Sequence, residues 1–462
     1  MLDIVVIGAG FSGLQAAYSA QKAGLSVAVV EARDRVGGKS HSIPLASSRG
    51  TADLGAAWVN QHLQPRVWSF IERLGLAVNI VKQRLGRTAV LVTADDQRIE
   101  FPYGITPEFS QEEKDNLVKI RDHIQAKSLN TEAPGRKDDS VSLDQYVRDL
   151  GASPKTVAMI NLWTRVMHGL ESTEESAAFF IDYCRTNHGL LAIRADDETG
   201  GNYMRLTSGT QSIARGLADL VGHKHIHLSS PVLSIEDKKT HVVVTTRNSR
   251  TFEAKKLILS IPSTMYRELQ FFPSLPPRLE QIASHTKLGH YNKALVFYDR
   301  PWWREGGFNG FIMSFKGPVC VARDTSVDKD GVYGLTCFLN GAPGEAWAKT
   351  SPSERRRVTV QQLAEMFRGG EEALSPREFV DQIWKHEEFS RGALVPVPAI
   401  GHYTEFADVY GKPVGNIHFA GTEYSRHWKG YIEGALSAGE VAAEEVVSLL
   451  GSKKTSELRS HL

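Results

Sequence analysis

The stretch DIVVIGAGFSGL, residues 3–14, decides how the chain begins to fold. It joins a β-branched run, residues 3–7, to a glycine loop, and the pattern after the loop is helical as far as Gly24. A second apolar run follows at residues 26–31. The order of strand, loop, helix and strand predicts a βαβ unit with two parallel strands.

The glycines of this loop have the G-x-G-x-x-G spacing of a dinucleotide-binding site. Gly8 permits a tight turn, Gly10 lets backbone approach a pyrophosphate, and Gly13 lets the helix pack on the strand. The amino terminus of the helix offers free N–H groups and positive dipole to the phosphates. Glu31, 18 residues after Gly13, ends the second strand. An acid there accepts hydrogen bonds from ribose hydroxyls and repels the 2′-phosphate of NADP.

The composition of the 462 residues indicates a folded chain of two or three domains, with 41% hydrophobic and 23% charged residues. Lys and Arg number 54 and Asp and Glu 53, so no positive field exists to attract nucleic acid. Cys184, Cys320 and Cys337 are far apart, which predicts neither a disulfide framework nor a metal site. This cysteine usage indicates an intracellular protein. No run of 18 apolar residues occurs, so we expect no transmembrane segment.

The tail after Gly451 is polar and ends in Ser460-His461-Leu462. A small, a basic and a leucine residue at the carboxyl terminus form the pattern of a peroxisomal address. We expect this tripeptide to bind the peroxisomal import receptor. If the tripeptide is only part of an arbitrary tail, the expected location is the cytoplasm.

The segment after Glu31 favours FAD over NAD. Residues 31–40 read EARDRVGGKS, in which Arg33, Arg35 and Lys39 stand beside two glycines and are suited to a pyrophosphate. This extension resembles that of the flavin amine oxidases.

Two further stretches carry the same resemblance: DLGAAW at residues 53–58, and FAGTEYSRHWKGYIEGALSAG at residues 419–439. The chain is similar to the monoamine oxidase branch of that family from residue 3 to about residue 448. The resemblance implies an α/β fold with a Rossmann-like FAD domain and a discontinuous α+β substrate domain. The expected boundaries are 1–77, 207–282 and 387–450 for the FAD domain, 78–206 and 283–386 for the substrate domain, and 451–462 for the tail.

The same resemblance implies which residues contact FAD. Lys39 stands where the family usually has arginine, and a helix starting near Ile432 would direct its amino terminus at the flavin ring. The implied cofactor-binding residues are Gly8, Gly10, Ser12, Gly13, Glu31, Arg33, Gly38, Lys39, Gly55, Ala56, Ala57, Val232, Trp384, Gly421, Thr422, Glu423 and Ile432.

The implied catalytic residues are Lys293, which in the family holds a water at flavin N5, and Tyr431, one wall of an aromatic cage around the amine. The other wall is Leu394 where the family has tyrosine, and Asn202 takes the place of a pocket glutamine. These departures indicate a more open and less aromatic pocket. Ala393 replaces the cysteine that bonds covalently to flavin, so we expect FAD to be non-covalent.

The resemblance therefore implies FAD-dependent oxidative deamination of a primary amine: hydride passes to flavin N5, the imine is hydrolysed, and O2 becomes H2O2. A bulky or long aliphatic amine, such as a fumonisin-type amine, fits the altered pocket, and homodimers are common in the family. Two alternatives stay open. One is an amino acid or polyamine oxidase, for which Arg165, Arg185 and Arg194 are candidates to bind a carboxylate. The other is a non-catalytic binder on the related scaffold of the GDP-dissociation inhibitors.

Overall fold

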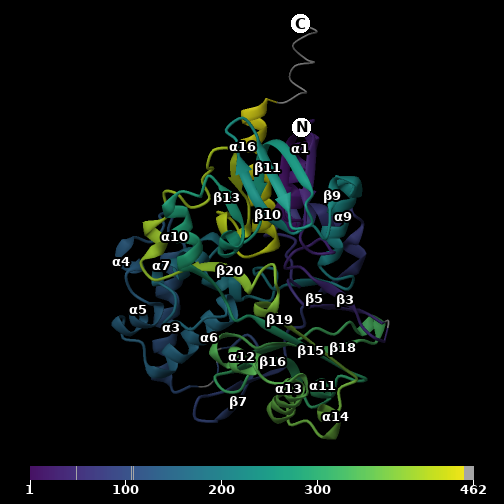
Figure 1. Ribbon diagram of the computed structural model, residues 1–462. Coiled ribbons are helices and arrows are strands. Elements are labelled where there is room, and N and C mark those ends of the chain that lie inside the picture. The colour runs from purple at the N-terminus through teal and green to yellow at the C-terminus, as the bar shows by residue number, and fades with distance from the viewer. Residues whose placement is uncertain (48, 106, 108, 452–462) are drawn as a thin grey trace.

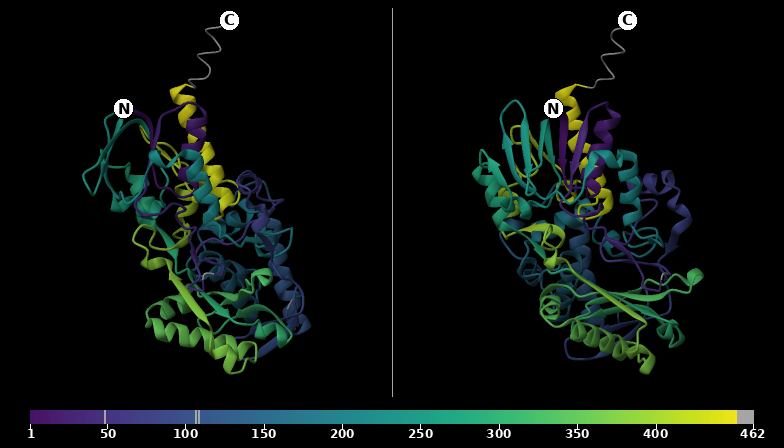
Figure 2. Two further views of the ribbon diagram at one scale, coloured as in Figure 1. Left: turned by 90° about the vertical axis from the view of Figure 1, so that its right-hand side faces the viewer. Right: turned by 45° about the vertical axis from the view of Figure 1, so that its right-hand side comes forward.

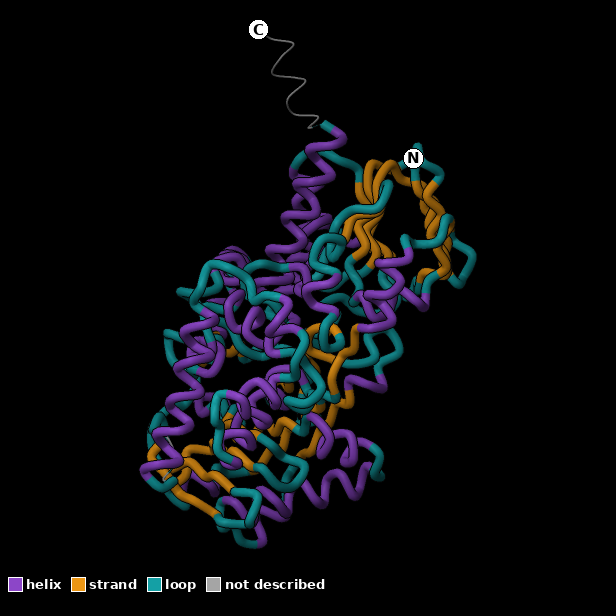
Figure 3. Tube along the Cα trace, turned by 90° about the vertical axis from the view of Figure 1, so that its left-hand side faces the viewer, coloured by secondary structure: helices purple, strands orange, loops and turns teal. Residues whose placement is uncertain are grey.

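Two large β-sheets, one toward each end of the molecule, organise the structure (Figure 1; Figure 3). The computed structural model describes residues 1–47, 49–105, 107 and 109–451. The C-terminal tripeptide and the rest of the predicted tail after residue 451 lie outside the described residues.

The first sheet contains the predicted βαβ unit. Its strand order is β13-β10-β11-β12-β1-β2-β9, with β21 paired to β12. β1 lies between β2 and β12 and pairs parallel with both, which explains its nearly continuous burial. The strands are β1 (Leu2–Ile7), β2 (Val27–Val30), β9 (Ile226–His227), β10 (Val232–Asp237), β11 (Val242–Thr246), β12 (Thr251–Leu259), β13 (Gln270–Phe272) and β21 (Ile417–Phe419).

Three helices cover one face of this sheet: α1 (Phe11–Lys22), α9 (Gln211–Val221) and α16 (Ile432–Leu450). α1 and α16 come from opposite ends of the chain and lie side by side (Figure 2). Gly439 permits this approach, since a Cβ there would lie 2.1 Å from the Ser12 carbonyl oxygen. α10 (Pro277–His285) packs on the opposite face.

The second sheet has the order β19-β15-β18-β17-β16-β6-β7. Alternate residues of its strands enter two cores, as Val321 and Ala322 of β17 do. Its strands are β6 (Thr88–Val92), β7 (Arg98–Pro102), β15 (Asn292–Tyr298), β16 (Phe308–Ser314), β17 (Val321–Asp324), β18 (Tyr333–Phe338) and β19 (Glu378–Ile383).

Helices cover both faces of the second sheet. On one face lie α3 (Gln111–Ser128), α5 (Leu143–Asp149), α6 (Pro154–His168), α7 (Ala177–Thr186) and α8 (Leu190–Arg194). On the other side lie α11 (Trp302–Glu305), α12 (Gly341–Ala348), α13 (Pro352–Met366) and α14 (Glu371–Leu374).

Short elements complete the described chain. Three two-stranded sheets pair β3 (Ser42–Pro44) with β4 (Thr51–Asp53), β5 (Ile80–Lys82) with β8 (Met204–Leu206), and β14 (Thr286–Gly289) with β20 (Ala393–Pro398). The remaining α-helices are α2 (Pro65–Arg73), α4 (Arg136–Asp139) and α15 (His402–Glu405).

The strands of the first sheet all come from segments predicted for the FAD domain, and those of the second from segments predicted for the substrate domain. The chain crosses between the sheets several times, in keeping with the expected discontinuous domains. The residue-level domain boundaries stay a prediction. No helix in the described part of the chain is long and apolar enough to cross a membrane.

Candidate active site

One cavity is lined by residues from both halves of the molecule. It brings together every predicted site residue except Gly13. The predicted residues on its wall are Gly8, Gly10, Ser12, Glu31, Arg33, Gly38, Lys39, Gly55, Ala56, Ala57, Asn202, Val232, Lys293, Trp384, Leu394, Gly421, Thr422, Glu423, Tyr431 and Ile432.

The glycine loop forms one end of this cavity. Gly8 has a φ of +101°, and a Cβ on Gly13 would lie 2.0 Å from the Gly8 carbonyl oxygen. Gly13 therefore serves helix packing rather than the cavity wall. α1 begins at Phe11 without a side-chain cap, which leaves its first N–H groups available where Phe11 and Ser12 line the cavity.

Glu31 is buried at the end of β2, and the backbone holds its carboxylate. Oε2 accepts a hydrogen bond of 2.6 Å from the Ala9 N–H, and Oε1 one of 2.9 Å from the Arg33 N–H. The Arg33 guanidinium pairs with Glu387 at 3.2 Å. Arg35 differs from Arg33, since it does not line this cavity and donates to the Gly38 carbonyl at 2.9 Å.

The Lys39 ammonium joins the glycine segment to the opposite wall. Its Nζ donates to the Leu394 carbonyl at 2.9 Å. Burial lowers the pKa of Lys39 to about 8, against the effect of the Glu423 carboxylate. Lys39 thus places a partly buried cation in the wall beside Leu394.

Lys293 is the second residue of β15, and its side chain reaches the predicted flavin segment. Its Nζ donates to the carbonyls of Asp53 and Gly55 at 3.0 and 2.6 Å, and lies 5.3 and 5.4 Å from the ring centroids of Trp58 and Phe338. Burial lowers its pKa to about 8, although the Asp53 carboxylate acts to raise it. Trp58 and Phe338 were not predicted as neighbours of this lysine.

The start of α16 is fixed by the residues before it. The Thr422 hydroxyl donates to the Tyr431 carbonyl at 3.1 Å and accepts from the Gly430 N–H at 2.7 Å. The buried Glu423 carboxylate accepts from the Ser263 N–H at 2.9 Å and hydroxyl at 2.6 Å, and burial raises its pKa. The Thr422 bonds hold Tyr431, the residue before α16, in place at the cavity wall.

The other end of the cavity is more aromatic than the sequence suggested. Leu394 lines the cavity, and a Cβ on Gly430 would lie 2.9 Å from Leu394 and 3.2 Å from Tyr183, so the Tyr183 ring lies close by. Burial, with nearby Tyr431, raises the pKa of Tyr183 well above its ordinary value, so the phenol stays neutral. The aromatic residues at this end are Trp163, Tyr183, Tyr291, Phe311, Phe338 and Tyr431.

Of the three arginines predicted as candidates to bind a carboxylate, the structure places only one on the cavity wall. Arg165 pairs with Glu171 at 2.9 Å and Arg185 with Asp182 at 2.6 Å, and neither lines the cavity. Arg194 does line it.

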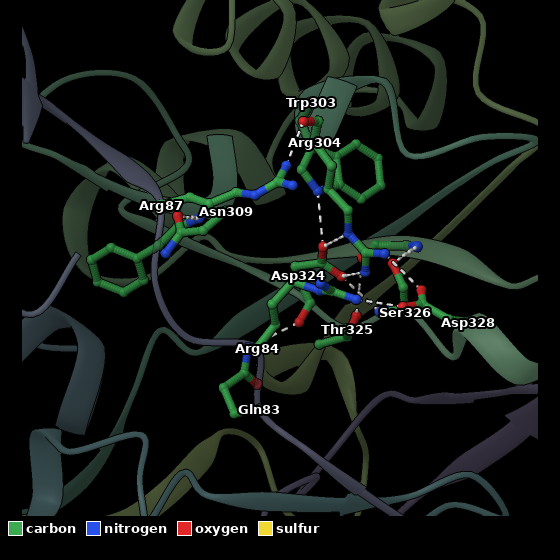
Figure 4. A network of polar contacts seen from close by, with 12 residues as sticks. Gln83, Arg84, Arg87, Trp303, Arg304, Asn309, Asp324, Thr325, Ser326 and Asp328 are labelled. Atoms are coloured by element: carbon green, nitrogen blue, oxygen red, sulfur yellow. Dashed lines mark hydrogen bonds and ion pairs between the residues drawn. The ribbon is translucent and has the colours of Figure 1, made fainter. Parts of the chain in front are cut away.

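A network of polar contacts surrounds Asp324, the last residue of β17 (Figure 4). The Asp324 carboxylate accepts from Trp303 Nε1 at 2.9 Å and from two nitrogens of Arg304 at 2.5 and 2.9 Å. Gln83 Nε2 donates to the Asp324 carbonyl at 3.0 Å, and its Oε1 accepts from Trp58 Nε1 at 3.2 Å. The network therefore fixes Trp58, which packs beside Lys293.

The cavity fits FAD at the end formed by the glycine loops. Gly38 has a φ of +58°, and a Cβ on it would lie 3.2 Å from the Gly10 Cα, so two glycine segments approach closely where backbone must meet a pyrophosphate. The held Glu31 carboxylate and the start of α1 border the same space.

Comparison with known proteins defines the class as a flavin-dependent oxidoreductase. The family model described as "Flavin containing amine oxidoreductase" matches residues 11–447. The chain is 32% identical to "Probable flavin-containing monoamine oxidase A" of Dictyostelium discoideum, over 98% of this chain and 99% of that protein. It is 28% identical to human "Amine oxidase [flavin-containing] B", over 99% of this chain and 88% of that protein.

Solved structures agree with this class. Putrescine oxidase bound to putrescine superimposes with a TM-score of 0.90 at 25% identity, covering 97% of this chain and 99% of that one. Cyclohexylamine oxidase from Brevibacterium oxydans gives the same TM-score at 23% identity over the same shares, which shows the fold alone. The chain belongs to the flavin-containing amine oxidase family. The predicted fold and family are confirmed, and its activity is FAD-dependent amine oxidation.

Proposed function

We propose that the protein oxidises a primary amine with a bulky or long aliphatic chain, and a fumonisin-type amine is one candidate. The observation that carries this proposal is the shared cavity, which buried Lys293 and the Tyr431 phenol line together with the glycine loops. When bound, FAD supplies the hydride acceptor and passes electrons to O2, so that amine, O2 and water become a carbonyl compound, ammonia and H2O2.

The tyrosine side chains of the cavity orient the amine, and Lys293 supplies a positive charge. The neutral phenols of Tyr183 and Tyr431 offer π faces beside which an uncharged amino group can be held. The Lys293 ammonium keeps positive charge near the predicted flavin segment, where reduction of O2 develops negative charge. The apolar wall excludes water from the amine.

A peroxide-coupled screen of aliphatic, aromatic, amino acid and polyamine substrates tests the proposal. Long aliphatic primary amines should give the highest kcat/KM. A marked preference for short arylalkyl amines or for α-amino acids would contradict the proposed substrate class.

We further propose that FAD is non-covalent, because Ala393 lines the cavity and has no nucleophilic atom. One solved putrescine oxidase, described as a structure-based redesign of cofactor binding, carries a cysteine in place of an alanine. Acid precipitation should release yellow FAD into the supernatant. Colour that stays in the washed pellet would contradict this, and Ala393→Cys is the variant expected to retain it there.

Peroxisomal import through Ser460-His461-Leu462 and assembly as a homodimer also stay proposals. Removal of the last three residues from a fluorescent fusion should shift it from peroxisomes to cytoplasm. Sedimentation of the purified protein measures its oligomeric state.

A further inference from the structure

Two guanidinium groups line the cavity at the end away from the glycine loops. They belong to Arg194 at the end of α8 and Arg323 in β17. The acidic residues among the described lining residues are Glu31 and Glu423, and both belong to predicted cofactor segments. The fixed charges at the substrate end are therefore cationic.

Arg323 has a partner within the protein. Its guanidinium pairs with the buried carboxylate of Asp196, which also accepts a hydrogen bond from the Tyr103 hydroxyl. The guanidinium carbon lies 5.0 Å from the Phe311 ring centroid. The charge of Arg323 is thus largely neutralised where it stands.

Arg194 has no such partner. Its guanidinium carbon lies 4.1 Å from the Trp163 ring centroid, and the described residues give it neither a hydrogen bond nor an ion pair. Burial and the nearby charges of Arg121 and Arg323 lower its pKa to about 10, so it remains charged at neutral pH. The π face offsets only part of the cost of an unpaired, partly buried cation.

The register of the second sheet places Arg323, whose charge lies near that of Arg194, away from Lys293. Val321, Phe338 and Lys293 share one row across β17, β18 and β15, whereas Arg323 lies two residues farther along β17. Two residues span about 7 Å along a strand and two strand spacings about 10 Å across the sheet. A ligand that reaches from the Lys293 end to Arg323 must therefore be extended.

We propose that the substrate amine carries a carboxylate several bonds from its amino group, and that Arg194 binds this carboxylate. The inference rests on the proposed amine oxidation and specifies its substrate class. A planar guanidinium donates two parallel hydrogen bonds to a carboxylate, which supplies the anion that Arg194 lacks. A polyamine would instead place a second ammonium against an unpaired cation.

The test compares alkylamines, diamines and ω-amino carboxylates of equal chain length, from aminobutanoate to aminododecanoate. In the native enzyme the best amino carboxylate should exceed its matched alkylamine in kcat/KM by about ten- to a hundredfold, as expected for hydrogen bonds between charged groups. Arg194→Gln should bring this ratio near one. Arg194→Lys should retain part of it, and Arg148→Gln, an exposed arginine on α5, should retain all of it.

Binding gives a readout independent of turnover. Unreactive alkanoates should perturb the flavin spectrum, with a Kd about ten- to a hundredfold higher in Arg194→Gln than in the native protein at equal flavin content. An equal ratio in native and Arg194→Gln enzymes would overturn the inference alone. A preference for α-amino carboxylates would overturn both the inference and the proposed substrate class. Failure to oxidise any amine would overturn the proposed function as well.

Discussion

The two ends of the cavity are built by different means. At the cofactor end, glycine backbone, helix termini and partnered charges such as Glu31 and Arg33 form the wall. At the substrate end, aromatic side chains and arginines from α6, α7, α8 and three strands form it. A backbone cradle needs particular residues at fixed spacing, whereas a side-chain pocket can be assembled from many positions. Local sequence motifs therefore specify the cofactor end, whereas tertiary packing forms the substrate end.

Lys293 lies where the two ends meet, and its removal should have the largest effect. Lys293→Met should slow reoxidation of the reduced enzyme by O2 by roughly 100-fold, because a preorganised buried charge near the developing anion is lost. Anaerobic reduction by amine should change far less. Rapid-reaction traces showing slowed reduction and normal reoxidation would assign the lysine to the substrate end instead.

Glu31→Ala tests the cofactor end on its own. Loss of charge-assisted hydrogen bonds should weaken FAD binding by roughly ten- to a hundredfold, measured by titration of the apo-protein. Asp34→Ala, a neighbouring acid that does not line the main cavity, is the matched control. Equal affinities for both variants would mean that Glu31 does not hold the adenosine portion.

Tyr431→Ala tests the substrate end. It should lower the rate of anaerobic reduction by roughly tenfold, because an oriented π face is lost, and Tyr431→Phe should keep most of the rate. Leu394→Ala, which removes no aromatic ring, should cost less. Equal losses in Tyr431→Ala and Leu394→Ala, at matched flavin content, would show that the aromatic wall does not orient the amine.

The smallest expected effect is on pH dependence. The pKa of Lys293 is lowered to about 8, so the lysine is charged below that pH and loses its proton above it. The rate of reoxidation should be highest at low pH and fall to about half near pH 8. Lys293→Met should lack this transition. A transition of the same midpoint in both enzymes would assign it to another group.

Much of the cofactor end could be predicted, since G-x-G-x-x-G and the acid at Glu31 fix backbone approach and hydrogen bonding locally. Other features could not. Arg165 and Arg194 look alike in sequence, and only their packing pairs one with Glu171 and leaves the other in the cavity. Arg323 carries no motif, and it lies in one strand of a sheet whose order is set by distant pairings.

The outcome at Leu394 has a similar cause. In the sequence, a leucine stands here where the resembling family has tyrosine. In the structure, Tyr183, more than 200 residues earlier in the chain, lies near Leu394, because both side chains lie close to Gly430. An aromatic ring supplied by a residue so distant in the chain leaves no pattern in the sequence around Leu394.

Anaerobic mixing of the purified protein with a long-chain primary amine tests the central claim most directly. The flavin absorbance at about 450 nm should bleach in a concentration-dependent manner and return on admission of O2, with one H2O2 formed for each amine consumed. A yellow protein that is not bleached by any primary amine, or a purified protein that holds no flavin, would contradict the account.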